Sequence, residues 1–252
     1  MGKSSKRQDA ESAREYRLRR EQEEREKLER QNRIIRNTLL IVLAVALVFA
    51  GIMGGIKAAE TVRINKNKVA VDPTTLSVTD QKSYYVKLTI AYTTAEHEQK
   101  QGDVIIHLRP DVAPDTVKNF QSLVAKKFYD GLTFHRIISG FMIQGGCPKG
   151  NGTGDAGYEI KGEFSANGKK NDLLHTRGVV SMARGETFNS ASCQFFIVHQ
   201  DSPHLNGQYA AFGEVVSGME TVDGVASVEV NESSSRPDHP VTILSAVFMT
   251  PQ

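Results

Sequence analysis

The sequence predicts a mainly β domain that follows a membrane-spanning helix. Three observations predict this arrangement. Residues 1–36 are charged or polar, residues 37–56 are apolar and uncharged, and short runs of alternating hydrophobicity follow from about residue 82 onward. Many short strands joined by polar, Gly-rich connections are typical of an antiparallel barrel or sandwich.

The first segment, residues 1–36, is expected to form a solvated charged helix. Acidic residues stand four positions ahead of basic ones, as at Glu26 and Arg30 or Glu29 and Arg33, which is the favourable order on a helix. The few apolar residues form no heptad seam, so a coiled coil is the less favoured alternative. Binding of this charged tail to a cytoplasmic partner is an open alternative.

The second segment, residues 37–56, contains no charged side chain. At about 1.5 Å per residue, it is long enough to span a hydrocarbon core of about 30 Å. A cleavable signal peptide normally has a shorter apolar stretch, so a retained signal-anchor is predicted. Basic residues are more frequent before this run than after it. The positive-inside rule therefore predicts a single-pass protein of the cell membrane, with a cytoplasmic N-terminus and an extracytoplasmic domain.

The third segment, residues 57–81, lacks periodicity and is predicted to be a tether, and residues 82–252 are predicted to be one globular domain. Alternating hydrophobicity predicts strands in this domain. The predicted strands are YVKLTIAY, GDVIIHL, LTFHRII, FMIQ, GVVSMA, CQFFIVH, YAAFGEVV and VTILSAVFM. The runs APDTVKNFQSLVAKKF and GMETVDGVASV are predicted to be helices, the first because Pro114 suits a first turn and Val117, Phe120 and Leu123 form an apolar stripe.

Several kinds of site are disfavoured by the sequence. The net charge is +2 and no basic stripe is interleaved with aromatic residues, so no nucleic-acid partner is expected. The loop GGCPKGNGTGDAG lacks the consecutive Gly-Lys-Ser/Thr of a Walker phosphate-binding motif and has no βαβ setting for a dinucleotide fingerprint. His135, His199 and His204 with Cys147 and Cys193 match no common zinc-ligand spacing, and nothing flanking Cys193 supports a nucleophilic pair with His135. No metal or cofactor is expected.

The stretch FHRIISGFMIQGG places an arginine inside an apolar cluster, which is costly unless the arginine is paired or used. If the strands alternate regularly, Phe134 and Arg136 share one face, and Met142 and Gln144 share one. An arginine extending from the edge of the core is one interpretation. The other is an apolar pocket with a fixed cation and an amide at its rim. The group concerned is Phe134, Arg136, Phe141, Met142, Gln144 and Phe196.

The blocks FHRIISGFMIQGG, GNGTG, SMAR, SASCQFFIVH and LNGQYAAFGEV together resemble the cyclophilin-type peptidyl-prolyl isomerases, in that family's order and spacing. The resemblance covers the chain from about Lys87 to the C-terminus. It implies a closed eight-stranded antiparallel barrel capped by two helices, with the active site on the outer face of the barrel. It also implies isomerisation of X–Pro bonds in proline-containing polypeptides, without a cofactor.

The resemblance also implies roles for individual residues. Arg136 matches the family's arginine and is expected to weaken the amide resonance of the X–Pro bond, and Gln144 matches the glutamine near the substrate backbone. The implied catalytic residues are Arg136, His135, Gln144 and Phe141. The implied substrate-binding residues are Met142, Phe196, Leu205, His204, Ala183, Arg184, Gln194, Gly152 and Tyr209.

Some positions depart from the family pattern. His204 stands where tryptophan is common, Tyr209 where histidine is common, and Arg184 where animal members have asparagine. These changes place substrate preference and binding of the cyclic inhibitor cyclosporin in question more than activity. Family topology brings Cys147 near Cys193. The two cysteines are therefore expected either to form a disulfide or to remain two buried free thiols.

The function predicted from these observations is prolyl isomerisation that assists the folding of exported or cell-surface proteins. A proline-peptide-binding holdase that uses the same groove with little turnover is the alternative.

Overall fold

The computed structural model describes residues 76–79 and 81–251. The predicted tail, the predicted membrane span and most of the predicted tether lie outside these residues. Among the described residues, no helix is both long enough and apolar enough to cross a membrane.

The described residues form one antiparallel sheet and two α-helices. The strands are β1 (Leu76–Thr79), β2 (Tyr85–Thr93), β3 (Gln99–Leu108), β4 (Phe134–Ile138), β5 (Met142–Gly145), β6 (Val179–Met182), β7 (Phe195–Val198), β8 (Ala211–Ser217) and β9 (Thr242–Pro251). The helices are α2 (Pro114–Ala125) and α3 (Met219–Ala226), with single 3-10 turns η2 (Ser165–Asn167) and η3 (Pro203–Leu205). All eight predicted strands and both predicted helices of the domain are confirmed, and β1 lies within the predicted tether.

The prediction of a closed eight-stranded barrel is wrong. The sheet has nine strands in the order β1-β9-β2-β3-β8-β6-β7-β5-β4 and is open, with β1 and β4 at its ends. The chain just before β4 meets β9 through one isolated bridge, between Thr133 and Thr242. Beyond this bridge a loop lies along β4, because the Ile137 N–H donates to the Ser235 carbonyl at 2.8 Å. A loop therefore occupies the edge at which a closing strand would pair.

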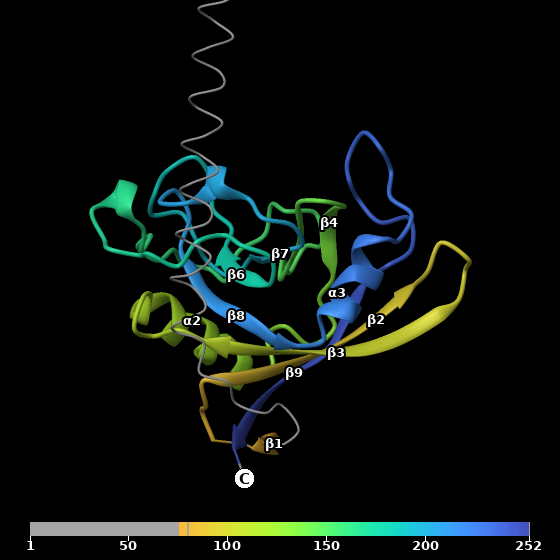
Figure 1. Cartoon of the computed structure of the whole chain (residues 1–252), viewed down its shortest axis with the longest axis horizontal. Coiled ribbons are helices and arrows are strands. Elements are labelled where there is room, and N and C mark those ends of the chain that lie inside the picture. The colour runs from red at the N-terminus through yellow and green to blue at the C-terminus, as the bar shows by residue number, and fades with distance from the viewer. Residues whose placement is uncertain (1–75, 80, 252) are drawn as a thin grey trace, which may run out of the picture. The chain divides into compact units, whose positions relative to one another are not determined.

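The sheet is strongly curved, and β2, β3 and β9 run side by side across it (Figure 1). Its concave side encloses the main core, whose centre is an aromatic cluster. The ring of Phe120 on α2 lies 5.1 Å from Tyr129, 5.5 Å from Phe195 and 5.1 Å from Phe212. Each such ring stabilises the fold by about 1.5–3 kcal/mol through burial. The apolar stripe predicted for this helix is thus the face that fills the core.

The amino end of α2 is held by a residue distant in sequence. Ala113, the N-cap residue, has no side chain that can accept a hydrogen bond. The buried carboxylate of Glu163 instead accepts from the Asp115 N–H at 3.2 Å, from the Thr116 N–H at 2.8 Å and from the Thr116 hydroxyl at 2.7 Å. A carboxylate is favourable there because free N–H groups and the helix dipole converge at that end.

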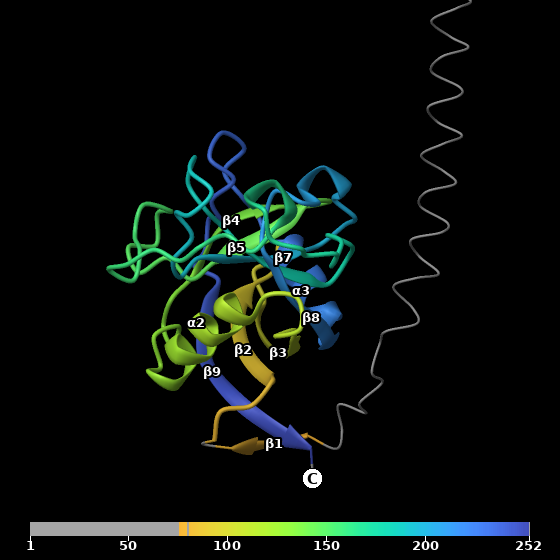
Figure 2. The same cartoon turned by 90° about the vertical axis from the view of Figure 1, so that its left-hand side faces the viewer.

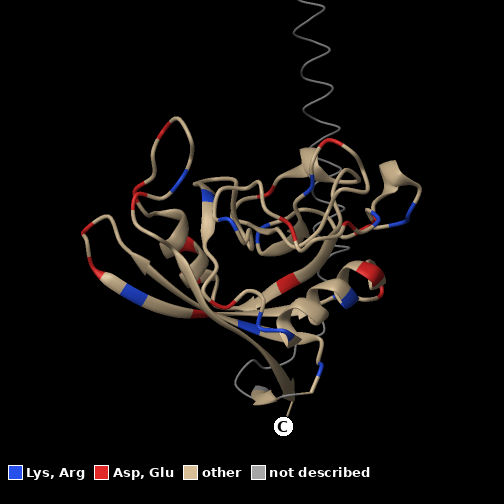
Figure 3. Cartoon of the chain, turned by 180° about the vertical axis from the view of Figure 1, so that it is seen from behind, with Lys and Arg blue, Asp and Glu red and all other residues tan. Residues whose placement is uncertain are grey.

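A second apolar cluster lies on the opposite side of the sheet from the main core. It is formed by Met142, Leu173, Val179, Phe196, Val198, Leu205 and Ala211. Long loops gather beside β4, β5 and β7 on this side (Figure 2), so the cluster is covered by loops rather than by a helix. Basic and acidic residues are interspersed over the described domain (Figure 3). The loop-covered outer face is where the predicted site residues converge.

Candidate active site

Strand register aligns the central residues of the site in one row. Arg136 on β4 pairs with Gln144 on β5, and Gln144 pairs with Phe196 on β7. Phe196 pairs in turn with Ser181 on β6. Directly paired residues of antiparallel strands project to the same face. Residues from four strands are therefore held side by side on the outer face of the sheet.

Arg136 reaches this face because β4 is irregular. The register shifts between Phe134 and Arg136, which is a β-bulge that re-aims the side chains beside it. As a result Phe134 points into the main core and is fully buried, whereas Arg136 is exposed. The prediction that these two residues share a face is wrong for this reason. The prediction that Met142 and Gln144 share a face is confirmed by their common place in the pocket described below.

A chain of amide groups orients the arginine. Gln194 donates through Nε2 to the carbonyls of Gly152 at 2.9 Å and Gly154 at 2.8 Å, so its Oε1 is the free acceptor. That oxygen accepts from Nε2 of Gln144 at 3.1 Å. Oε1 of Gln144 then faces Nη1 of Arg136 at 3.5 Å. Two loop carbonyls thus determine which end of Gln144 meets the guanidinium.

The guanidinium stands at the mouth of an apolar pocket of about 150 Å³. Its lining residues are Arg136, Phe141, Met142, Gln144, Ala183, Arg184, Phe196, Leu205 and Tyr209. Met142, Phe196 and Leu205 form its buried floor, and each is less than a tenth exposed. The pocket combines a small apolar floor with two guanidinium groups, those of Arg136 and Arg184, and the amide of Gln144. Such a site holds a compact apolar ring beside a hydrogen-bond donor.

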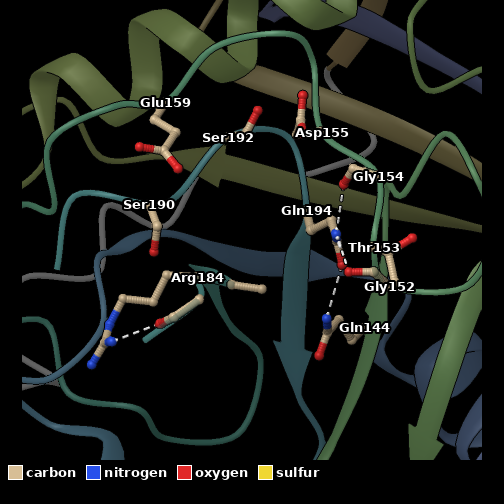
Figure 4. A pocket seen from close by; sticks show the side chains of 12 residues that line it. Gln144, Gly152, Thr153, Gly154, Asp155, Glu159, Arg184, Ser190, Ser192 and Gln194 are labelled. Atoms are coloured by element: carbon tan, nitrogen blue, oxygen red, sulfur yellow. Dashed lines mark hydrogen bonds between the residues drawn. The ribbon is translucent and has the colours of Figure 1, made fainter. Parts of the chain in front are cut away.

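A second pocket of about 280 Å³ adjoins the first, and both are lined by Gln144, Ala183 and Arg184. Figure 4 shows Gln194 in this second pocket, hydrogen-bonded toward Gly152, Gly154 and Gln144. The carboxyl groups of Asp155 and Glu159 lie on the side of this pocket away from Gln144. The two pockets form one groove, in which an extended peptide can place two side chains.

Arg184 separates the two pockets and is fixed in place. It donates to the carbonyls of Gln208 at 3.1 Å, Gly185 at 2.9 Å and Glu186 at 3.1 Å. Its guanidinium carbon also lies 4.7 Å from the ring centroid of Tyr209, within the range of a cation–π contact. Arg184 is therefore a wall of the groove whose donors are largely occupied.

Two predicted site residues are absent from the linings of both pockets. His135 is buried beneath the Gly152 loop, where a Cβ on Gly152 would lie 3.4 Å from its Nε2. Burial lowers the pKa of His135, and the positive charges of Arg236 and Arg136 add to that effect, so the ring is neutral and supports the loop. His204 is on η3, and its ring lies 5.4 Å from that of Phe141. It is therefore beside the wall of the 150 Å³ pocket, which Phe141 lines.

Cys147 and Cys193 are two buried free thiols and do not form the disulfide that the family topology left possible. Burial alone would raise the pKa of the Cys147 thiol, but backbone N–H groups of residues 149–154 outweigh that effect and lower it. The Gly154 N–H, for example, lies 3.3 Å from the Cys147 sulfur. For Cys193, burial raises the thiol pKa to about 11. Cys147 thus helps to shape the loop whose carbonyls hold Gln194.

Several residues of the second pocket are not among those predicted from the sequence. They are Thr153, Gly154, Asp155, Glu159, Gly185, Ser190 and Ser192. The glycine-rich composition of the loop GGCPKGNGTGDAG was the available signal for part of this set, because glycines let a backbone approach a neighbour closely. That signal does not reveal which carbonyls face Gln194.

Comparisons with known proteins agree with this fold and site. Residues 91–248 match the family model described as cyclophilin type peptidyl-prolyl cis-trans isomerase/CLD. The chain is 49% identical over 123 residues to peptidyl-prolyl cis-trans isomerase B of Bacillus subtilis, covering 49% of this chain and 82% of that protein. It is 42% identical over 146 residues to a peptidyl-prolyl cis-trans isomerase of Synechococcus elongatus, covering 55% and 96% of the two chains.

A solved structure is similar as well. It is a cyclophilin type peptidyl-prolyl cis-trans isomerase of Cryptosporidium parvum, crystallised in the presence of the dipeptide Ala-Pro, with a TM-score of 0.54 and 30% identity. The match covers 64% of this chain and 99% of that one. The chain belongs to the cyclophilin-type peptidyl-prolyl cis-trans isomerase family, and it is an isomerase of X–Pro bonds. The holdase alternative is not favoured.

Proposed function

We propose that Arg136 catalyses rotation about the X–Pro bond by donating a hydrogen bond toward the prolyl nitrogen. Amide resonance gives this rotation a barrier close to 20 kcal/mol. A donor at the nitrogen favours its pyramidal form, in which resonance is lost, so it stabilises the twisted state more than the planar one. Arginine suits this role because it stays protonated and presents a rigid fork of donors.

The groove supplies the rest of this mechanism. The proline ring occupies the apolar pocket over Phe196, while Gln144 holds the substrate backbone beside the guanidinium. Residues before the proline extend toward the second pocket, past Arg184. The observation that carries the proposal is the position of the Arg136 guanidinium, 3.5 Å from Oε1 of Gln144 at the mouth of the pocket. Preorganised donors of this kind need no rearrangement as the transition state forms.

The clients are proposed to be proline-containing segments of exported or cell-surface proteins. Residues 37–56 contain no charged side chain, and basic residues are concentrated ahead of them, which supports a signal-anchor and an extracytoplasmic isomerase domain. The alternating acids and bases of residues 1–36 support a solvated helix that a cytoplasmic partner can bind.

The catalytic proposal is tested by replacing Arg136 and measuring isomerisation of a proline peptide. Arg136→Ala is expected to reduce kcat/KM roughly a hundredfold, about 3 kcal/mol, as for loss of one preorganised donor. Arg136→Lys keeps the charge without the fork and is expected to retain part of the activity. Wild-type turnover in a folded Arg136→Ala protein would contradict this role.

A further inference from the structure

His199, one residue beyond β7, joins three elements that are far apart in the sequence. Its Nδ1 accepts a hydrogen bond from the Gly140 N–H, in the turn between β4 and β5, at 2.9 Å. Its Nε2 lies 3.2 Å from Oδ1 of Asp223 on α3. The side chain of His199 is only 19% exposed. None of these residues lines either pocket.

These contacts determine the tautomer of His199. A ring nitrogen that accepts from a backbone N–H has no proton, so in the neutral ring the proton is on Nε2. Nε2–H then faces the carboxylate of Asp223. Oδ1 of the Asp223 carboxylate is buried and makes no hydrogen bond of good geometry among the described residues. Its contact with His199 is therefore electrostatic. The proton on Nε2 makes this contact favourable.

The hydrogen bond to Gly140 holds the residue next to a lining residue of the 150 Å³ pocket. The next residue, Phe141, forms the pocket wall, and its carbonyl accepts from the His199 N–H at 2.9 Å. His199 thus holds Gly140 with its side chain and Phe141 with its main chain. Gly140 has φ +75°, a left-handed conformation that glycine adopts without strain. The turn closes with its own hydrogen bond, from the Phe141 N–H to the Ile138 carbonyl at 3.0 Å, and the contacts of His199 attach it to β7.

We propose that His199, in its neutral form with the proton on Nε2, is a positioning residue for the isomerase reaction because it fixes the turn that presents Phe141 to the proline ring. This inference rests on the proposed use of the groove for catalysis. Loss of the Gly140 bond therefore frees the turn and weakens substrate binding, without displacing Arg136 on β4.

Arg177 links the carboxylate of Asp223 to the segment that carries His199. Its Nη2 lies 2.7 Å from Oδ2 of Asp223, and its Nη1 donates to the His199 carbonyl at 2.9 Å. Asp201 faces the same segment and accepts from the Arg177 N–H. The ring of His204, which lies outside the linings of both pockets, is 5.4 Å from that of Phe141 and is a second neighbour of this wall.

Two substitutions separate the contacts of His199. In His199→Asn, Oδ1 takes the place of Nδ1 and keeps an acceptor for Gly140 but loses the contact with Asp223. In His199→Gln, Nε2 takes the place of the ring Nε2 and keeps a donor for Asp223 but loses the acceptor for Gly140. Neither side chain titrates. The pair therefore tests the Gly140 bond against a general effect of altering this position.

The experiment measures kcat and KM of full-length protein in detergent at pH 7.5 with a proline peptide. His199→Gln is expected to raise KM threefold to tenfold, as for loss of one hydrogen bond, with kcat changed less. His199→Asn is expected to keep KM within about twofold of wild type. His204 is present in all three proteins, so their difference reports on His199.

The inference is overturned if His199→Gln matches wild type in KM, or if both variants are impaired equally. Nitrogen-15 NMR of histidine-labelled wild type gives a test that does not depend on a folded variant. A proton on Nδ1 rather than Nε2 of His199 at pH 7.5 would overturn the inference as well. Arg136→Ala in the same assay separates the two proposals, because retained turnover there contradicts the catalytic role of Arg136 and not the His199 bond.

Discussion

The residue proposed to act on the X–Pro bond, Arg136, is held by hydrogen bonds more than by packing. Arg136 is exposed, and its position depends on Gln144, which in turn depends on Gln194 and two loop carbonyls. Because each amide must present one specific end to its neighbour, a change at the loop is transmitted to the guanidinium. The sequence motif identifies Arg136 and Gln144, but it does not reveal the loop that orients them.

His175 connects the floor of the pocket to the stability of the domain. It is buried, its Nε2 lies 2.9 Å from the Ser181 hydroxyl, and its ring stacks on Phe196 at 6.0 Å. Burial lowers its pKa from 6.5 to about 4, against a smaller opposing effect of Asn206. The ring is therefore neutral in the folded domain at pH values where the unfolded chain already binds a proton.

That difference predicts acid sensitivity. Below pH 6.5 the unfolded chain takes up a proton that folded His175 takes up only near pH 4, so stability is lost as the pH falls through this window. The free energy of unfolding should decrease by about 2–3 kcal/mol between pH 7 and pH 4.5 from this group. Urea unfolding at both pH values should show a smaller decrease for His175→Gln. Equal decreases would assign the acid sensitivity to other groups.

His204 is expected to govern binding of cyclosporin. In family members with tryptophan at this position, the indole packs on the inhibitor and donates a hydrogen bond to it. Imidazole covers less apolar area, so wild type should bind cyclosporin weakly, and His204→Trp should bind it roughly tenfold more tightly. Peptide turnover should change much less, because Arg136 and the pocket floor are untouched. Equal cyclosporin affinity, measured by titration, would show that His204 does not contact the inhibitor.

At the scale of elements, periodicity predicted every strand and helix of the domain except β1. This four-residue strand lies in the predicted tether and pairs with the carboxyl-terminal end of β9, where Leu76 meets Pro251, so a contact distant in sequence places it. Periodicity also failed at β4, because the bulge between Phe134 and Arg136 inverts the alternation. A bulge is specified by tertiary contacts on both sides of the strand, and those are not visible in a five-residue run.

The dependence of α2 on Glu163 gives a prediction at this scale. The helix has no side chain of its own at the N-cap, and the Glu163 carboxylate accepts from two N–H groups and one hydroxyl at its amino end. Glu163→Gln replaces one oxygen with a donor and removes the charge, so it should lower the free energy of unfolding by roughly 1–2 kcal/mol. Denaturant unfolding measures this loss. Asp115→Asn, in the first turn but solvent-exposed, is the matched control with a smaller effect.

At the scale of the whole molecule, the resemblance predicted the fold family, and what it missed was long-range. The gap between β4 and β9 and the loop along β4 depend on contacts between residues separated by about a hundred positions, such as Ile137 and Ser235. The same holds for the site, where Gln194 bonds to carbonyls 42 and 40 residues away. Motifs predict which residues meet a substrate, whereas these contacts decide how precisely those residues are held.

The placement of the domain relative to a membrane is the last prediction. Residues 37–56 are uncharged and follow a basic segment, so the N-terminus should stay in the cytoplasm and the domain should lie outside it. Protease added to intact spheroplasts should therefore remove the isomerase domain and spare an epitope tag placed at residue 1. Lysed spheroplasts serve as the control, because there the tagged tail should be digested too. Protection of the domain in intact spheroplasts, with digestion only after lysis, would place it in the cytoplasm and contradict both the orientation and the proposal of exported clients.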